Sequence, residues 1–143
     1  MEERLIPETL RPFLGQLGEA LTAVANGNPD PMKALCSHRD AISQCGFWGG
    51  VDSGWAGVSD RWDWVAAQFV PGPGTVTSDP AFLTVTGDMA YGVFVERWRG
   101  QFVGRSELAD FMVRATLIFR REDGAWNAIH RHGDDRVTKA PPS

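Results

Sequence analysis

The chain has 143 residues, of which 43% are hydrophobic and 22% are charged, and its formal net charge at pH 7 is −4. This length and composition predict one globular domain, residues 1–137, followed by a disordered tail at residues 138–143. An acidic chain without a run of Lys or Arg is not expected to bind nucleic acid, and no apolar stretch approaches the roughly 18 residues of a membrane-spanning helix.

Two cysteines, Cys36 and Cys45, are too few for a disulfide framework, so reduced thiols are expected. Residues 1–5 lack the basic start and the apolar stretch of a secretory signal, which favours a cytoplasmic protein. The sequence has no Gly-rich phosphate loop, nucleotide fingerprint or serine nucleophile elbow, so no cofactor is expected.

Three helices are predicted in the first half of the chain. The first and third carry apolar residues at a spacing of three to four, and Asp30-Pro31 provides a start for a short helix between them. Turn residues at 26–28 and 71–74 end the first and third helices. The predicted helices span residues 6–24, 30–36 and 53–69.

One short strand is predicted before the third helix, at residues 41–48, and four longer strands are predicted after it. The later segments 75–86, 89–99, 107–121 and 125–133 are rich in β-branched and aromatic residues, and tight turns separate the first pair and the last pair. Because the helices and most of the strands are segregated along the chain, the predicted fold class is α+β.

The central predicted strands carry large apolar side chains on both faces. In residues 90–98, Phe94 and Trp98 fall on one face, and Tyr91 and Val93 fall on the other. An antiparallel sheet with one solvated face would alternate apolar and polar residues instead. Three helices can cover only one face, so we expect a homodimer through the outer face of the sheet.

Residues 114–134 resemble the closing hairpin of SnoaL-like proteins, members of the nuclear transport factor 2-like superfamily, which also contains ketosteroid isomerases. The pattern is RxT…FRREDGxW…HRHxD, and residues 37–40, 54–55 and 87–91 are also similar, so that the resemblance spans about residues 8–135. It implies a cone-shaped fold, in which a curved antiparallel sheet packs against three helices and encloses a pocket, and commonly a dimer through the convex face. Such a fold supports isomerases, dehydratases, epoxide hydrolases, cyclases and binding or assembly modules.

His130 and His132 are the candidate catalytic residues. Residues two apart on a strand share a face, so both are expected to lie with Trp126 and Ala128, on the face that the resemblance places in the pocket. An imidazole there could act as a general acid or base near neutral pH. A structural role, with hydrogen bonds to a neighbouring strand or to Glu96, is the alternative. The same spacing could hold a metal, but no third ligand is evident, so no metal is expected.

Six residues are predicted to bind the ligand. Arg114 and Thr116 share a face that the resemblance places on the pocket side, where a buried guanidinium would need Glu96 or an anionic ligand as its partner. A solvent-facing arginine is the alternative. The aromatic residues are mostly expected in the core, and Trp48 and Trp55 are expected near the pocket mouth by resemblance. The full predicted binding set is Arg114, Thr116, Glu96, Tyr91, Trp48 and Trp55.

Two departures limit the resemblance. Ketosteroid isomerases carry their catalytic carboxyl groups at positions that fall near Cys45 and near Thr116 or Leu117, and this chain has neither carboxyl. Steroid isomerisation by that mechanism is therefore not expected.

In addition, Phe47 and Trp48 are adjacent on a predicted strand, so only one of them should face the pocket.

The leading hypothesis is a cofactor-independent enzyme of the isomerase, dehydratase, cyclase or epoxide hydrolase type, acting on a small apolar substrate. His130 or His132 would move the proton, and Arg114 would stabilise developing negative charge. The alternatives are a non-catalytic module that binds a small molecule in the same pocket, and an oligomeric scaffold.

Overall fold

The computed structural model describes residue 6 and residues 8–143, and in this part of the chain three helices precede or interrupt a six-stranded sheet. The second and third helices and the four long strands lie close to their predicted bounds, whereas the first helix begins at Arg11, five residues later than predicted. The elements are α1 (Arg11–Val24), α2 (Asp30–Leu35), β1 (Ser43–Cys45), β2 (Val51–Ser53), α3 (Gly54–Ala67), β3 (Thr75–Thr86), β4 (Met89–Gly100), β5 (Ala109–Glu122) and β6 (Ala125–Asp134).

The predicted early strand is wrong in its extent. Instead of one strand over residues 41–48, the structure has β1, a turn at residues 46–50, and β2, which pairs antiparallel with β1. The secretory-signal prediction concerns residues 1–5, which lie outside the described residues. Among the described residues, no helix is both long and apolar enough to cross a membrane.

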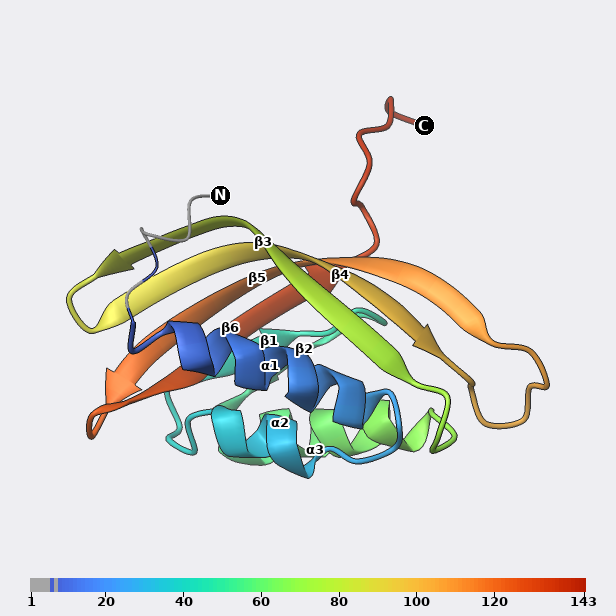
Figure 1. The fold of residues 1–143 in the computed structure, drawn as a ribbon, viewed down its shortest axis with the longest axis horizontal. Helices are drawn as coiled ribbons and strands as arrows, with labels where there is room; N and C mark the ends of the chain where they lie inside the picture. The colour runs from blue at the N-terminus through green and yellow to red at the C-terminus, as the bar shows by residue number, and fades with distance from the viewer. Residues whose placement is uncertain (1–5, 7) are drawn as a thin grey trace.

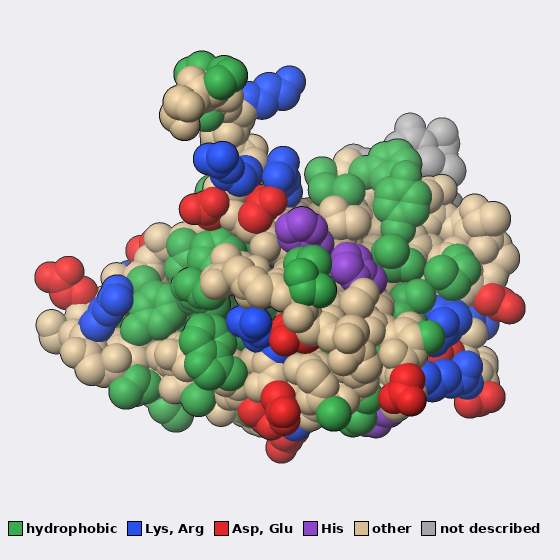
Figure 2. Space-filling model, turned by 180° about the vertical axis from the view of Figure 1, so that it is seen from behind, with side chains coloured by type: hydrophobic (Ala, Val, Ile, Leu, Met, Phe, Trp, Pro, Cys, Tyr) green, Lys and Arg blue, Asp and Glu red, His purple; other side chains and the backbone are tan. Residues whose placement is uncertain are grey.

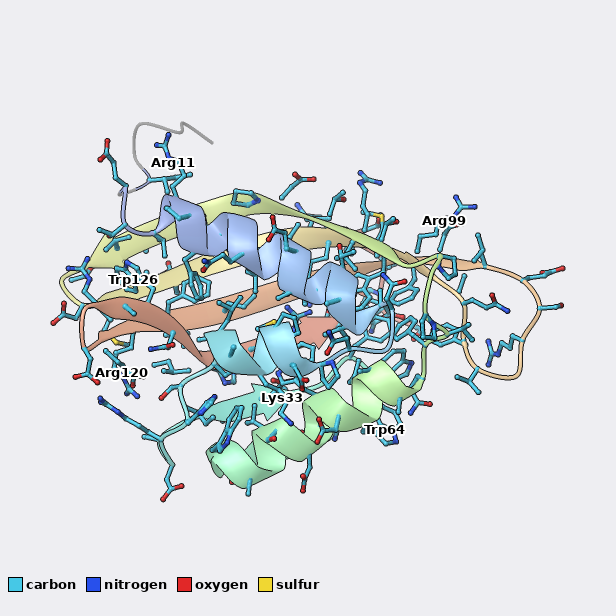
Figure 3. The ribbon with its side chains drawn as sticks, turned by 60° about the horizontal axis from the view of Figure 1, so that its bottom comes forward. Arg11, Lys33, Trp64, Arg99, Arg120 and Trp126 are labelled. Atoms are coloured by element: carbon cyan, nitrogen blue, oxygen red, sulfur yellow. The ribbon has the colours of Figure 1, made fainter. Side chains whose placement is uncertain are left out.

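The strands form one curved sheet in the order β2-β1-β6-β5-β4-β3, which confirms the predicted α+β class. Hairpins make the β3–β4, β4–β5 and β5–β6 pairs antiparallel, whereas β1 and β6, which are distant in sequence, pair in parallel. A parallel pair needs a long connection, and α3 and four strands provide it here. The sheet arches over the helices, which all lie on one side of it (Figures 1 and 3).

We call the side of the sheet that faces the helices the inner face and the opposite side the outer face. The core fills the inner side: Phe94 and Phe119 are almost fully buried, and Phe13 from α1 meets Phe119 edge-on at 5.1 Å between ring centroids. The buried stripe of α3 contributes Val58 and Trp62. The predicted alternation in β4 and β5 is confirmed, because their buried residues fall at alternate positions.

A β-bulge in β6 changes which residues face the helices. Ile118 pairs with His130 and the next residue of β5 pairs with Ala128, so Ile129 is an extra residue in the ladder. An extra residue shifts the alternation of the strand by one position. Ala128 is therefore buried on the inner face, but after the bulge it is Arg131 that is buried there, while His132 is exposed.

The end of α1 is fixed to the start of β3 by one asparagine. The side-chain oxygen of Asn26 accepts hydrogen bonds from the backbone N–H groups of Gly72 and Gly74, and its amide nitrogen donates to the carbonyl of Thr22. A Cβ on Gly74 would lie 2.2 Å from the carbonyl oxygen of Ala25, so only glycine permits this approach. After Asp134 the chain forms no helix or strand and stands away from the sheet (Figure 1). Disorder of residues 138–143 stays a prediction.

Candidate functional site

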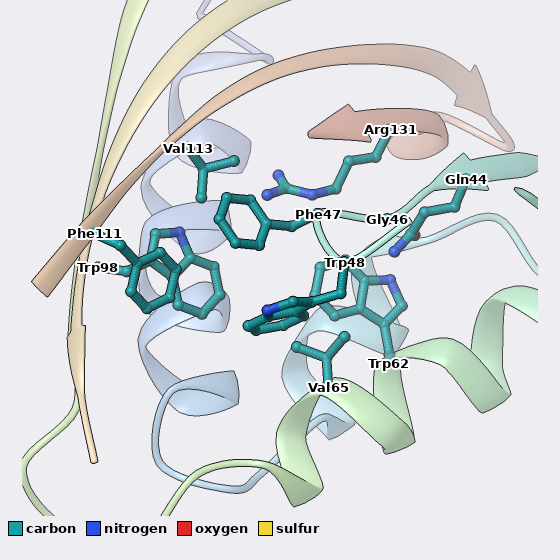
Figure 4. A pocket seen from close by; sticks show the side chains of 10 residues that line it. All are labelled: Gln44, Gly46, Phe47, Trp48, Trp62, Val65, Trp98, Phe111, Val113 and Arg131. Carbon is teal, nitrogen blue, oxygen red and sulfur yellow. The ribbon is translucent and has the colours of Figure 1, made fainter. Parts of the chain in front are cut away.

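A narrow cavity lies between the inner face of the sheet, α3 and the turn at residues 46–50 (Figure 4). The space that the centre of a water molecule can occupy is about 30 Å³, which is room for about two waters. Its walls are mainly aromatic. The lining residues are Gln44, Gly46, Phe47, Trp48, Trp62, Val65, Trp98, Phe111, Val113 and Arg131.

Flat rings form the outer part of the cavity. Trp98 and Phe111 stack at 5.8 Å with an interplanar angle of 18°, and Phe47 lies 5.4 Å from Phe111. Trp48 is 42% exposed and contacts Trp64 edge-on at 5.8 Å. A large indole that is only half covered, at the mouth of an apolar cavity, lies where it can contact a bound molecule.

Phe47 and Trp48 both line this cavity, so the prediction that only one could do so is wrong. That prediction assumed a continuous strand, but β1 ends at Cys45 and the alternation of a strand does not apply to the following turn. Gly49 and Gly50 have φ values of 95° and 86°, in the region that favours glycine.

Arg61 of α3 holds this turn from behind. Its Nε donates to Asp52 at 2.8 Å, and its guanidinium lies over the ring of Trp64 at 5.6 Å. A Cβ on Gly50 would come within 2.6 Å of its Nη2. The turn that carries the two aromatic rings of the mouth therefore packs directly against a salt-bridged arginine.

The deep end of the cavity is polar because of one buried ion pair. Arg131 donates from Nη1 and Nη2 to the two carboxylate oxygens of Glu96, each at 2.7 Å, and Trp98 Nε1 donates to Glu96 at 3.0 Å. Glu96 is fully buried, and Arg131 is 8% exposed. Burial disfavours the charged guanidinium, but the charge and hydrogen bonds of Glu96 outweigh burial, so the pKa of Arg131 is raised and it stays protonated.

Two further polar groups lie beside Arg131. Gln44 is only 4% exposed and lines the cavity from β1. The indole Nε1 of Trp62 is buried and makes no hydrogen bond of good geometry within the described part of the chain, but the indole interacts with the thiol of Cys36. In Figure 4 the two side chains enter from β1 and α3 and direct their nitrogens toward the same part of the cavity.

A second, smaller cavity lies behind Gln44, Trp62 and Arg131, with space for about one water. Cys36 lies in its wall, and burial raises the pKa of its thiol to about 12. The thiol is therefore protonated at neutral pH and is a poor nucleophile or base. The charge of Arg131 and the interaction with the Trp62 indole lower the pKa of this thiol, but burial outweighs both.

The predicted catalytic histidines do not point into the main cavity. His130 and His132 follow the bulge at Ile129 and lie on the outer face, opposite to Ala128, so the prediction that they share its face is wrong. His130 Nδ1 lies 2.8 Å from Ser43 Oγ on the neighbouring strand. Burial, together with the charge of His132, lowers the pKa of His130. Two histidine side chains lie side by side on this surface (Figure 2).

Arg114 and Thr116 also lie on the outer face, not on the pocket side. Their positions in β5 alternate with the buried Ala115, and Arg114 is exposed. Arg114 binds both carboxylate oxygens of Asp134, at 3.0 and 2.7 Å, and this bond raises its pKa. The predicted pairing of Arg114 with Glu96 is therefore wrong, because the two side chains project from opposite sides of the sheet.

The remaining predicted binding residues divide between the cavity and the surface. Trp48 lines the cavity, as expected, and Glu96 lies behind its polar wall. Tyr91 is 44% exposed on the outer face. Trp55 stacks on His38 at 3.8 Å, away from the residues that line the cavity.

Sequence reasoning missed two polar residues of the site, Arg131 and Gln44. Arg131 was hidden by the bulge, because a regular strand from Ala128 would place it on the outer face. Gln44 is one residue of a three-residue strand, which is too short for a pattern to be visible. Glu96 was predicted, and its alternation with Phe94 and Trp98 on one face requires a buried cationic partner, which is Arg131 and not the predicted Arg114. Among the described residues, no group of three metal-ligating side chains is present.

The comparison with protein families and curated proteins gives one match. A family model described as a SnoaL-like domain matches residues 16–133, most of the chain. No curated protein matches significantly.

Several solved structures share the fold. A nuclear transport factor 2-like superfamily protein from Salmonella enterica serovar Typhimurium has a TM-score of 0.78 at 15% identity, covering 92% of this chain and 94% of its own. A candidate dehydratase of the same family from Streptomyces avermitilis has a TM-score of 0.70 at 19% identity, covering 93% and 100%. A candidate calcium/calmodulin-dependent protein kinase II association domain from Xanthomonas campestris has a TM-score of 0.71 at 14% identity, covering 91% and 87%. At these identities the likeness concerns the fold alone.

Proposed function

The chain belongs to the SnoaL-like family, and from that premise we propose that it binds a small, largely apolar molecule in the cavity under the turn at residues 46–50. The observation that carries this proposal is the combination of aromatic walls with a polar end. Flat apolar rings and a few convergent polar groups are the usual composition of a small-molecule site.

The arrangement favours binding over acid–base catalysis. A general acid or base must come within hydrogen-bonding reach of the reacting atom. His132 lies on the far side of the sheet, and His130 borders only the smaller second cavity, where its Nδ1 is bonded to Ser43. Glu96 is covered by Arg131, which occupies both of its oxygens. The thiol of Cys36 stays protonated. Among the described residues, the cavity wall therefore offers hydrogen-bond donors but no group that is ready to exchange a proton near pH 7.

Entry of a ligand requires movement of the mouth. The cavity has room for about two waters, whereas a benzene ring alone has six carbon atoms. The turn that carries Phe47 and Trp48 has glycine at both ends, which lets its backbone change conformation with little strain. We propose that this turn opens to admit the ligand and closes over it.

A filling substitution tests this function. Val65 lines the cavity from α3, and Val65→Trp would occupy the space, whereas Val93→Trp places the same side chain on the outer face. Native mass spectrometry should show a small molecule bound to the wild type and to the Val93 variant, released unchanged on unfolding, and absent from the Val65 variant. Equal loading of all three, or a ligand that is chemically altered after incubation, would contradict a binding role for this cavity.

The outer face supports a second proposal, a homodimer. Phe82 and Tyr91 are 48% and 44% exposed with ring centroids 5.5 Å apart, and Met89 beside them is 41% exposed. Hydrophobic side chains also gather near the two histidines in Figure 2. A contiguous exposed apolar patch is typical of an association surface. Light scattering should give twice the monomer mass for the wild type and the monomer mass for Tyr91→Glu; a wild-type monomer would contradict it.

A further inference from the structure

We infer that two copies of the chain associate through the outer face while His130 and His132 are neutral, and that mild acid separates them by protonating these histidines. This inference rests on the proposed homodimer and adds its regulation. Both histidines lie on the outer face, where His130 is half-buried and His132 is exposed. Figure 2 shows them side by side, with hydrophobic side chains gathered around them.

The histidines lie in the same rows of the sheet as the exposed apolar patch. His130 pairs with Ile118, which pairs with Tyr91, and His132 pairs with Thr116. Paired residues on one face have Cβ atoms about 4.5–5.5 Å apart. Ile118, Tyr91 and Thr116 also line a shallow hollow of the outer face. A second copy that covers Tyr91 and this hollow therefore lies against both imidazoles.

The symmetry of a homodimer makes protonation unfavourable wherever the two-fold axis passes. A two-fold interface brings the same patch of both copies together, so each histidine meets either the partner's histidines or the partner's apolar surface. In the first case like charges repel each other. In the second case a charged imidazole loses its hydration against apolar groups. Only neutral imidazoles suit both arrangements.

The other titratable groups beside the imidazoles do not offset this charge. They are Cys45 on β1, Arg114 and Arg120 on β5, and Asp134 on β6. Arg120 is bound to Glu122. Asp134 attracts a protonated His132, but Arg114 already holds both of its oxygens. Each proton taken up by His130 or His132 therefore adds a positive charge to a face whose neighbouring ion pairs are balanced.

The surroundings of His130 already disfavour its charged form. Burial, followed by the charge of His132, lowers the pKa of His130, and these effects outweigh the hydrogen bond with Ser43. A second copy on this face buries the imidazole further and lowers its pKa again. When association lowers a pKa, the separate protomers bind the proton more tightly, so association weakens as the pH falls through the pKa of the separate protomer.

Sedimentation equilibrium at pH 7.5 and 5.5, at one ionic strength, tests this inference on the full chain. If one imidazole in each copy must be neutral, the dissociation constant of the dimer depends on two protons, one from each copy. With an ordinary histidine pKa of about 6.5 or slightly lower, it should rise about 10- to 100-fold between these two pH values. Circular dichroism at both pH values checks that the protomers stay folded.

The three histidines of the chain provide the variant and its control. The double variant His130→Gln, His132→Gln should dimerise at pH 7.5 within about threefold of the wild-type dissociation constant, and that constant should change less than about threefold at pH 5.5. His38→Gln removes the histidine that stacks on Trp55 of α3, on the side of the helices, and should keep the full wild-type change. If the double variant does not fold, the exposed His132→Gln alone should reduce the change.

The outcomes separate this inference from the homodimer itself. A wild-type dimer that is equally stable or more stable at pH 5.5 would overturn the inference and leave the homodimer standing. The inference also fails if the double variant keeps the wild-type change, or if His38→Gln abolishes it. A double variant that is monomeric at pH 7.5 would contradict it too, because the imidazoles would then hold the dimer together. If the wild type is a monomer at both pH values, the homodimer proposal fails, and this inference fails with it.

Discussion

The inner and outer faces of the sheet each carry an arginine that binds both oxygens of a carboxylate, and comparing the two pairs shows what burial adds to the same geometry. On the inner face Arg131 and Glu96 are almost without solvent contact, and on the outer face Arg114 is half exposed beside Asp134. The shortest N–O distance is 2.7 Å in both. Similar contacts therefore have different consequences, because only the inner pair has lost its hydration.

The largest expected effect is the loss of one member of the inner pair. Arg131→Met leaves the carboxylate of Glu96 buried without a cation, which is expected to lower the free energy of unfolding by about 3–5 kcal/mol. Arg114→Met is the matched change on the outer face, where solvent hydrates the carboxylate that remains. Denaturant unfolding should show a large shift of the midpoint for the first variant and almost none for the second. Equal shifts would refute the comparison.

This comparison also explains which parts of the protein could be predicted. Long periodic segments determined the helices, the four long strands and the two faces of β4 and β5. The face on which each side chain of β6 lies could not be derived in this way, because one extra residue at Ile129 reverses the alternation after it. His130 and His132 therefore lie on the outer face and Arg131 on the inner face, which is the reverse of the prediction. The prediction that only one of Phe47 and Trp48 faces the cavity was wrong for a related reason, since a turn replaces the expected strand.

Substitutions in the turn over the cavity are expected to lower stability by a smaller amount. Gly50→Ala adds a Cβ that displaces the guanidinium of Arg61 and also strains a backbone with φ of 86°, so we expect a loss of about 1–3 kcal/mol. Gly49→Ala has a similar φ of 95° but no neighbour within 4 Å, so it should show the backbone cost alone. Thermal unfolding measures both, and acrylamide quenching should rise more in the Gly50 variant because Trp48 is less well held. Identical behaviour of the two variants would mean that Arg61 does not hold the turn.

The outer face should respond to pH where the inner face does not. Burial lowers the pKa of His130 in the folded protein, so the unfolded chain binds the proton more tightly. Stability should therefore fall as the pH drops below about 6.5, the ordinary value for histidine, and His130→Asn should reduce that fall. Urea unfolding at pH 7.5 and 5.5 measures the difference between wild type and variant.

A control variant separates the titration of a carboxyl group from the titration of His130. The bond from Arg114 lowers the pKa of Asp134, so the stability that this carboxylate contributes is lost only as the pH falls through about 4 and below. Asp134→Asn should therefore leave the change between pH 7.5 and 5.5 as it is in the wild type. The interpretation fails if Asp134→Asn abolishes that change or if His130→Asn leaves it intact.

The smallest expected effect is that of the histidines on ligand binding. The double variant His130→Gln, His132→Gln changes two polar side chains on the outer face, and neither faces the aromatic wall of the main cavity. The fraction of protein that carries a small molecule should therefore stay within about twofold of the wild-type value at pH 7.5, because no residue of the aromatic wall has changed. Native mass spectra of both proteins under the same conditions measure this. If the double variant lost its small molecule as Val65→Trp is expected to, coupling through the sheet would join the two faces, and their energetic separation would be refuted.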